Sequence, residues 1–291
     1  MNTSEEIVPA AEPLNTLVTV KPDATADNPP WGLGLATLTW FLSVGLLLLV
    51  PPVFSLPYLL YRYRDAGSPT REILLSDKNF IFFNILGVIP VHVLTFALVW
   101  AVATRFGRYP FGRVLGWSWS PHFGFWKSVG LAILLLAIGI AIISRFGGEP
   151  TDMEKIILSS RLNACTTAFL ATATAPLVEE LIYRGILYSA LHRALGMGGA
   201  VVIVMGLFTL VHVPEYWPNF GALSAILLLS FALTLVRART ARLLPCYVIH
   251  LVFNGVQSLM IVFAPYLPDV DKMLQRRATG AVLIRLCAFH L

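Results

Sequence analysis

Charged residues are scarce in this chain: Asp, Glu, Lys and Arg make up only 13% of its 291 residues, against 57% hydrophobic residues. So few charges exclude an ordinary soluble domain, in which about a quarter of the residues are charged. Several stretches carry no charge over the roughly 20 mostly apolar residues that a helix needs to cross a bilayer. The sequence therefore predicts an integral, multi-pass membrane protein, in the inner membrane if its source is a bacterium.

The chain also lacks the marks of several other classes. Its cysteines, Cys165, Cys246 and Cys287, are odd in number and form no CxxC pair, which excludes a disulfide framework and a thiolate zinc site. No glycine-rich phosphate loop or internal repeat is present. The alternation of polar and apolar residues typical of membrane β-barrels is absent as well, so the spans are expected to be helices.

Seven charge-free runs predict an all-α bundle of seven membrane helices. They cover residues 31–61, 79–104, 128–144, 162–178, 194–214, 216–236 and 243–268, and the fourth continues through PLVEELIYRGILYSAL. The C-terminal AVLIRLCAFHL is too short for an ordinary span and could be an interfacial helix or a partial eighth span. Pro51 and Pro52 are expected to break the first run, because each removes a backbone donor and crowds the preceding turn.

Composition divides the chain into four expected segments. Residues 1–30 are polar and acidic without apolar periodicity, which predicts a disordered tail. Membrane helices without a recognisable motif follow over 31–150, a catalytic membrane domain over 151–268, and a tail or partial helix over 269–291. The basic residues, Arg237 among them, lie at span ends, which favours anionic lipid headgroups over nucleic acid as partners.

Function is best sought among the few polar residues inside the spans. An ionisable side chain at membrane depth costs about 2.5–3.5 kcal/mol on insertion scales and generally faces the bundle interior or a water-filled cavity. The deep set is Glu179, Glu180, Arg184, His212, His250 and Asn254. His92 in the second run is a lone extra, and such a residue is more often a hydrogen-bonded core histidine than a catalyst.

Helical spacing divides the work of these residues. Glu180 and Arg184 are four residues apart, so they share one helix face and can neutralise each other. Glu179 is rotated by about 100° from Glu180 and is left to find another partner. His250 and Asn254 are also four residues apart, so imidazole and carboxamide project together from one face.

A bundle could bring Glu179, His212, His250 and Asn254 to one interior point. The carboxylate could then take a proton from water while the histidines orient that water or protonate the leaving group, and the amide could hold a developing oxyanion. Alternatively, Glu179, His212 and His250 are three possible ligands for a catalytic Zn²⁺ with an open fourth position. These residues alone do not choose between the two.

Three motifs stand in order on successive predicted helices: EELIYR at 179–184, FTLVH at 208–212 and HLVFN at 250–254. In letters and order they resemble the signatures Glu-Glu-x-x-x-Arg, Phe-x-x-x-His and His-x-x-x-Asn of the CPBP intramembrane proteases, the CAAX-processing and bacteriocin-processing enzymes also called Abi. The resemblance covers roughly residues 162–263. The chain also lacks the zinc signature HExxH, as that family does.

The resemblance implies an endopeptidase that cleaves within or beside the membrane, as the Ras-converting enzyme removes the last three residues of prenylated CAAX proteins. It implies that Glu179 is the general base and that Glu180 and Arg184 form a structural salt bridge. His212 and His250 would polarise the water or bind metal, and Asn254 would help to hold the oxyanion. The cofactor is then none or Zn²⁺, and the substrate a peptide or a membrane-protein tail, prenylated or not.

Two classes compete with a protease. In a membrane immunity or scaffold protein the same polar cluster would only lock helices together, but such contacts average about 0.6 kcal/mol, which makes six polar residues a poor source of stability. A proton-coupled transporter would use Glu and His as a relay and would be expected to show repeated halves with matching broken helices, which the sequence lacks. Both arguments favour a catalytic role for the polar residues over a scaffold or a transporter.

Overall fold

The computed structural model of the protein describes residues 24–65, 67–148, 151–263 and 266, and these residues form helices without any strand. The elements are α1 (Leu33–Arg62), α2 (Arg71–Ser76), α3 (Lys78–Leu86), α4 (Val88–Thr104), α5 (Phe111–Leu115), α6 (Phe125–Phe146), α7 (Asp152–Ser159), α8 (Arg161–Ala173), α9 (Ala175–Glu180), η1 (Leu181–Leu187), α10 (Tyr188–Tyr216), α11 (Phe220–Thr240) and α12 (Leu244–Phe263). The predicted all-α class is confirmed.

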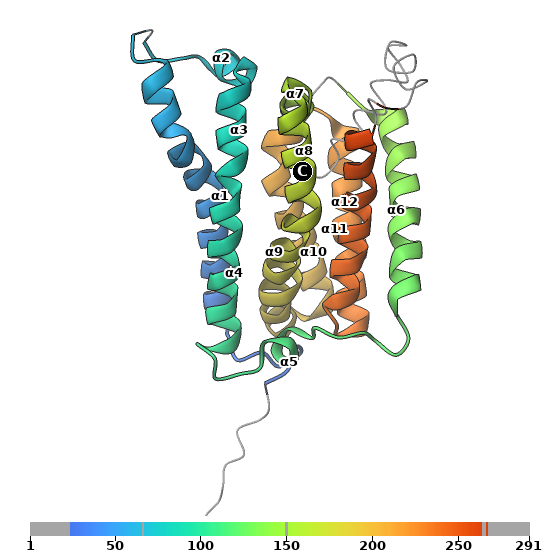
Figure 1. The fold of residues 1–291 in the computed structure, drawn as a ribbon. Coiled ribbons are helices and arrows are strands. Elements are labelled where there is room, and N and C mark those ends of the chain that lie inside the picture. The colour runs from blue at the N-terminus through green and yellow to red at the C-terminus, as the bar shows by residue number, and fades with distance from the viewer. Residues whose placement is uncertain (1–23, 66, 149–150, 264–265, 267–291) are drawn as a thin grey trace, which may run out of the picture.

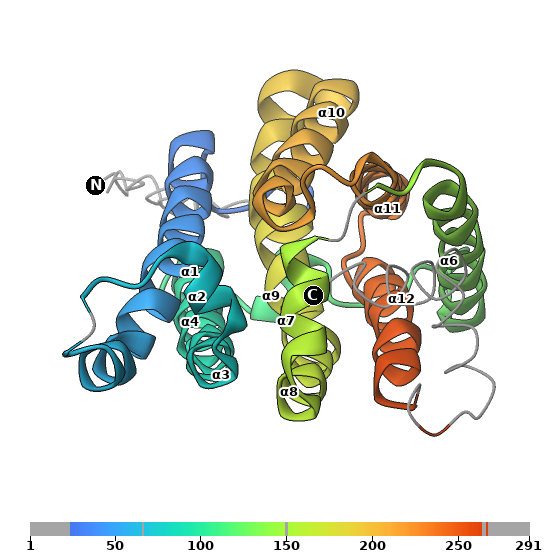
Figure 2. The ribbon, with the colours of Figure 1, turned by 90° about the horizontal axis from the view of Figure 1, so that it is seen from above.

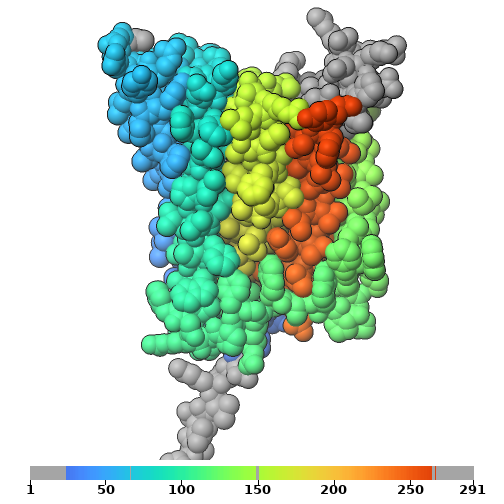
Figure 3. All heavy atoms as spheres, in the orientation of Figure 1, coloured from blue at the N-terminus to red at the C-terminus, as the bar shows by residue number. Residues whose placement is uncertain are grey.

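The helices form one bundle with the middle of the chain at its centre. Figure 2 shows α1, α3 and α4 at one side, α6, α11 and α12 at the other, and α7 to α10 between them. On the face seen in Figure 3, the surfaces of α3 and α4, of α8, of α12 and of α6 lie side by side in that order. The segment that carries the first motif is therefore enclosed by both groups of helices.

Six helical runs in the described residues are long and apolar enough to cross a membrane. They are Leu33–Arg62, Lys78–Thr104, Phe125–Phe146, Arg161–Tyr216, Phe220–Thr240 and Leu244–Phe263. A count of seven or eight is not confirmed, because the fourth and fifth predicted spans fall within one helical run of 56 residues. The candidate eighth segment, AVLIRLCAFHL, lies outside the described residues.

The long run reverses direction at Gly196. This glycine has φ 73° and ψ 177°, a conformation that interrupts the helical backbone. Residues with a side chain rarely adopt it. A straight helix of 56 residues would be about 84 Å long, far more than the roughly 30 Å hydrocarbon core of a bilayer. Figure 1 shows the chain running down through α8 and α9 and back up through α10. The turn brings the first two motifs to the same depth.

The expected break of the first run at Pro51 and Pro52 is wrong. Helix α1 continues through both prolines and Pro57, and in Figure 1 it bends without ending. Each proline leaves the carbonyl four residues back without its usual N–H donor, and the helix continues without these bonds. The α3–α4 junction packs closely here: a Cβ on Gly87 would lie 2.7 Å from Pro51 Cα.

The described end of the predicted polar tail, residues 24–30, lies against the bundle. Ala24, Ala26 and Trp31 beside it are buried. The Trp31 indole donates to Ile186 O in η1 at 3.0 Å, and Arg237 donates to Ala26 O at 3.0 Å. The prediction of disorder is untested for residues 1–23, which lie outside the described residues.

Candidate active site

The first motif ends in a π-helical turn, η1. All seven residues of this turn are buried, and the Tyr188 N–H donates to Tyr183 O, five residues back. π-helical turns are rare and frequently mark functional sites. Two side chains from elsewhere bind backbone carbonyls of the turn: Arg237 Nε donates to Arg184 O at 3.1 Å, and Trp31 Nε1 donates to Ile186 O.

Glu180 and Arg184 form the expected salt bridge, with Arg184 Nη1 2.8 Å from Glu180 Oε1 and both side chains fully buried. Arg184 also donates to the Thr234 and Ser230 hydroxyls of α11, at 3.2 and 2.8 Å. The same Glu180 oxygen lies 2.9 Å from His250 Nδ1. Since a carboxylate can only accept, the proton of that bond belongs to Nδ1 of His250.

Glu179 lies on the other side of the His250 ring from Glu180. Its side chain is 27% exposed, and its Oε2 lies 3.7 Å from Nε2 of His250, the ring nitrogen that points away from Glu180. That separation is too long for a direct hydrogen bond and is of the size that a shared water can bridge. His250 thus stands between the two glutamates, bound to one and facing the other.

His212 is held by its own helix. Its Nδ1 lies 2.7 Å from Phe208 O, and because a carbonyl only accepts, Nδ1 carries the proton and the chemistry of the ring falls to Nε2. The Phe208 ring packs against three site residues: its centroid is 4.8 Å from the His212 ring, 6.0 Å from the His250 ring and 4.6 Å from Arg184 Cζ. The two residues of the second motif therefore position each other.

Asn254 does not join the other residues. Its Nδ2 donates to Ala171 O in α8 at 3.0 Å, and its buried Oδ1 has no hydrogen-bond partner in the part of the chain that the structure describes. It ties α12 to the helix that leads into the first motif. Its contact with an oxyanion stays a prediction.

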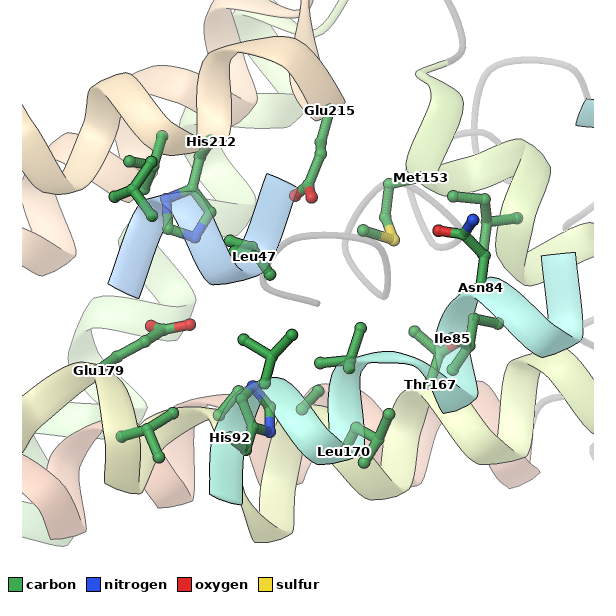
Figure 4. A pocket seen from close by; sticks show the side chains of 18 of the residues that line it. Leu47, Asn84, Ile85, His92, Met153, Thr167, Leu170, Glu179, His212 and Glu215 are labelled. Atoms are coloured by element: carbon green, nitrogen blue, oxygen red, sulfur yellow. The ribbon is translucent and has the colours of Figure 1, made fainter. Parts of the chain in front are cut away.

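A cavity of about 450 Å³ opens in front of Glu179 and His212. Figure 4 shows both side chains pointing into it, with His92 on the opposite helix. About half of its apolar lining comes from the N-terminal helices, including Leu47 of α1, Ile85 of α3 and Val91 of α4. The helices without a motif therefore supply much of the site, while His250 and Asn254 stand behind the cavity wall.

The metal alternative needs three converging donors. No group of three or more His, Cys, Asp or Glu side chains within the described ranges lies close enough together to hold a metal ion. Nδ1 of His212 and of His250 are both engaged by protein oxygens, and Nε2 of His250 stands 3.7 Å from Glu179. These side chains therefore do not form a metal-ligand set, and the proposed reaction uses no metal.

The three motifs thus meet around one buried ion pair beside one cavity, and a comparison with known families bears on them directly. Residues 161–256 match the family model described as type II CAAX prenyl endopeptidase Rce1-like. This segment is an Rce1-like domain. No curated protein and no solved structure matches the chain.

The Rce1-like domain spans α8 to most of α12 and contains all six predicted site residues. Together with the six apolar runs, it identifies the chain as an integral, multi-pass membrane protein, and it supports a protease. The glutamate and metallo types of protease are not distinguished by the match.

Three residues near the Rce1-like site were missed or misjudged from sequence. Glu215 lines the cavity three residues after His212, and that helical spacing was a usable signal. Arg237, expected at lipid headgroups, is instead 1% exposed and bound to the backbone of η1. His92 is hydrogen-bonded as expected, with Nδ1 2.7 Å from Thr174 Oγ1, but it also lines the cavity.

Proposed function

We propose that the chain is an intramembrane endopeptidase that hydrolyses a peptide bond of a peptide or membrane-protein substrate, with Glu179 as the base that activates water. The proposal rests on the different environments of the two adjacent glutamates. Glu180 is locked between Arg184 and His250, whereas Glu179 faces the cavity with His250 3.7 Å behind it. Of the two glutamates, only Glu179 lines the cavity, where it can meet both a substrate and a water.

The water step follows from the hydrogen-bond directions. His250 donates a hydrogen bond from Nδ1 to Glu180, so its Nε2 carries the lone pair of the ring. A water between Glu179 and His250 donates one hydrogen to each, and its oxygen lone pairs then point away from both. As that oxygen attacks the carbonyl carbon of the substrate, Glu179 takes the proton.

His212 serves the substrate side of the reaction. Because its Nδ1 proton is held by Phe208 O, a second proton can be gained or lost only at Nε2. The Nε2 lone pair of His212 can accept a hydrogen bond from the scissile N–H and hold the peptide in place, and the leaving amine receives the proton that Glu179 took from water. The carbon–nitrogen bond then breaks, and atoms and charges balance.

The remaining motif residues position these groups. Arg184 fixes Glu180, Glu180 fixes the tautomer of His250, and the Phe208 ring packs against both histidines. Asn254 holds the backbone of α8 just before the first motif. Such support matters because a reacting group misplaced by about 1 Å can cost a hundredfold in rate.

The proposal is tested by incubating the purified chain, in zwitterionic lipid vesicles, with a library of apolar peptides and identifying products by mass spectrometry. The parent is expected to release fragments that Glu179→Gln and His212→Ala do not. Glu72→Gln, an exposed glutamate in α2, serves as the matched control and should cleave as the parent does. Full activity in Glu179→Gln would remove Glu179 as the base, and absence of cleavage by the parent would count against the protease.

A further inference from the structure

A second carboxylate faces the same cavity. Glu215 lies one helical turn beyond His212 on α10, and Figure 4 shows its carboxylate pointing into the cavity across from the helix that carries Glu179. No hydrogen bond or ion pair to this carboxylate is formed by any of the described residues. The mechanism above gives Glu215 no task.

None of the described residues that line the cavity forms an ion pair with Glu215. Arg71 is the one Lys or Arg among the described residues that line the cavity, and it is ion-paired with Asp152. Most of the other lining residues are apolar, such as Leu74, Ile156 and Val211. A carboxylate in such a setting is costly unless a cation accompanies it. A cation supplied by a bound substrate would offset this cost.

We propose that Glu215 is a specificity-determining residue that binds the basic side chain of a lysine or arginine close to the scissile bond of the substrate. This inference rests on the proposed function, since the peptide must lie between Glu179 and Glu215 to present a carbonyl to one and an adjacent side chain to the other. A single carboxylate suits an ammonium or guanidinium group, whereas Ca²⁺ or Mg²⁺ would require several oxygen ligands.

Two measurements test the inference. The first compares cleavage of paired apolar peptides that differ only by lysine, norleucine or glutamate at each position near the cut, in zwitterionic vesicles so that the lipid surface does not attract the basic peptide. The second measures binding of the same peptides to Glu179→Gln, which is expected to bind without cleaving. Each is repeated with Glu215→Gln and Glu215→Lys, and with Glu72→Gln as the control of equal charge change.

The lysine peptide should be preferred over its norleucine twin by at least about tenfold, the value of one charge-assisted hydrogen bond. Glu215→Gln should bring that ratio close to one, Glu215→Lys should favour the glutamate peptide, and Glu72→Gln should keep the parental ratio. An equal ratio in the parent and Glu215→Gln, in cleavage or in binding, overturns the inference while leaving the protease intact. Failure of cleavage in the parent counts against the proposed function alone, since the binding ratios still decide the role of Glu215.

Discussion

Loss of the Glu180 carboxylate should strongly destabilise the fold. In Glu180→Ala the fully buried Arg184 loses its ion pair, and His250 loses the acceptor of its Nδ1 proton. Removing one partner of a buried pair costs about 3–5 kcal/mol. Arg184 keeps its bonds to Thr234 and Ser230. The broken ion pair should therefore cost an amount at the lower end of that range, about 3 kcal/mol. The lost histidine bond adds about 1 kcal/mol, for a total near 4 kcal/mol.

The assay is equilibrium unfolding in detergent micelles, followed by circular dichroism. The double variant Glu180→Ala/Arg184→Met removes the stranded charge and should be more stable than Glu180→Ala alone. Asp65→Ala is the matched control, because Asp65 pairs with Arg64 at the surface with side chains 85% and 69% exposed, and it should leave stability unchanged. A Glu180→Ala protein as stable as the parent, or a double variant weaker than the single one, would refute the assignment.

Four further predictions concern other parts of the molecule. Arg237→Met should lower the free energy of unfolding by about 1–3 kcal/mol, because buried carbonyls at 26 and 184 lose their donor; unchanged stability would contradict this. Gly221→Ala should cost about 1–3 kcal/mol, since its Cβ would lie 2.9 Å from Gly147 N, whereas Gly206→Ala, with open space around it, should not destabilise. Burial alone would raise the pKa of Asp77, but hydrogen bonds from the Phe80 N–H and from tyrosine hydroxyls lower it overall. Its contribution to stability is therefore full above about pH 4 and is lost as the pH falls through the lowered pKa, a loss that Asp77→Asn should abolish in acid unfolding curves. Chelation with 1,10-phenanthroline should leave cleavage unchanged, and loss of activity that zinc restores would mean that the donors converge on a metal.

The fold class and the pairing within the first motif could be predicted because each follows from local spacing. Apolar runs fix the helices, and the four-residue separation of Glu180 and Arg184 survives even in a π-helical turn, with a bond of 2.8 Å. The prediction for Pro51 and Pro52 failed because the helix tolerates the missing proline N–H groups where it packs closely against the α3–α4 junction, with Gly87 beside Pro51.

The rest depended on tertiary packing that no local pattern encodes. The link from His250 to Glu180 joins residues 70 apart, and the cavity exists because helices without any motif stand opposite the Rce1-like domain. Arg237 sits at a span end in the sequence and would ordinarily reach the lipid surface, but it lies inside the bundle and donates to the Arg184 carbonyl of the π-helical turn. The position of Arg237 along the chain could not predict this contact.

The central claim is that Glu179 activates water while Glu180 only supports the site. The most direct test is the single-turnover rate of cleavage of one identified peptide by Glu179→Gln, with equilibrium unfolding measured on the same sample. We expect the rate to fall by about 10²–10⁴-fold, the usual contribution of a general base, with stability equal to that of the parent. A Glu179→Gln protein that is equally stable and cleaves at the parental rate would contradict the account.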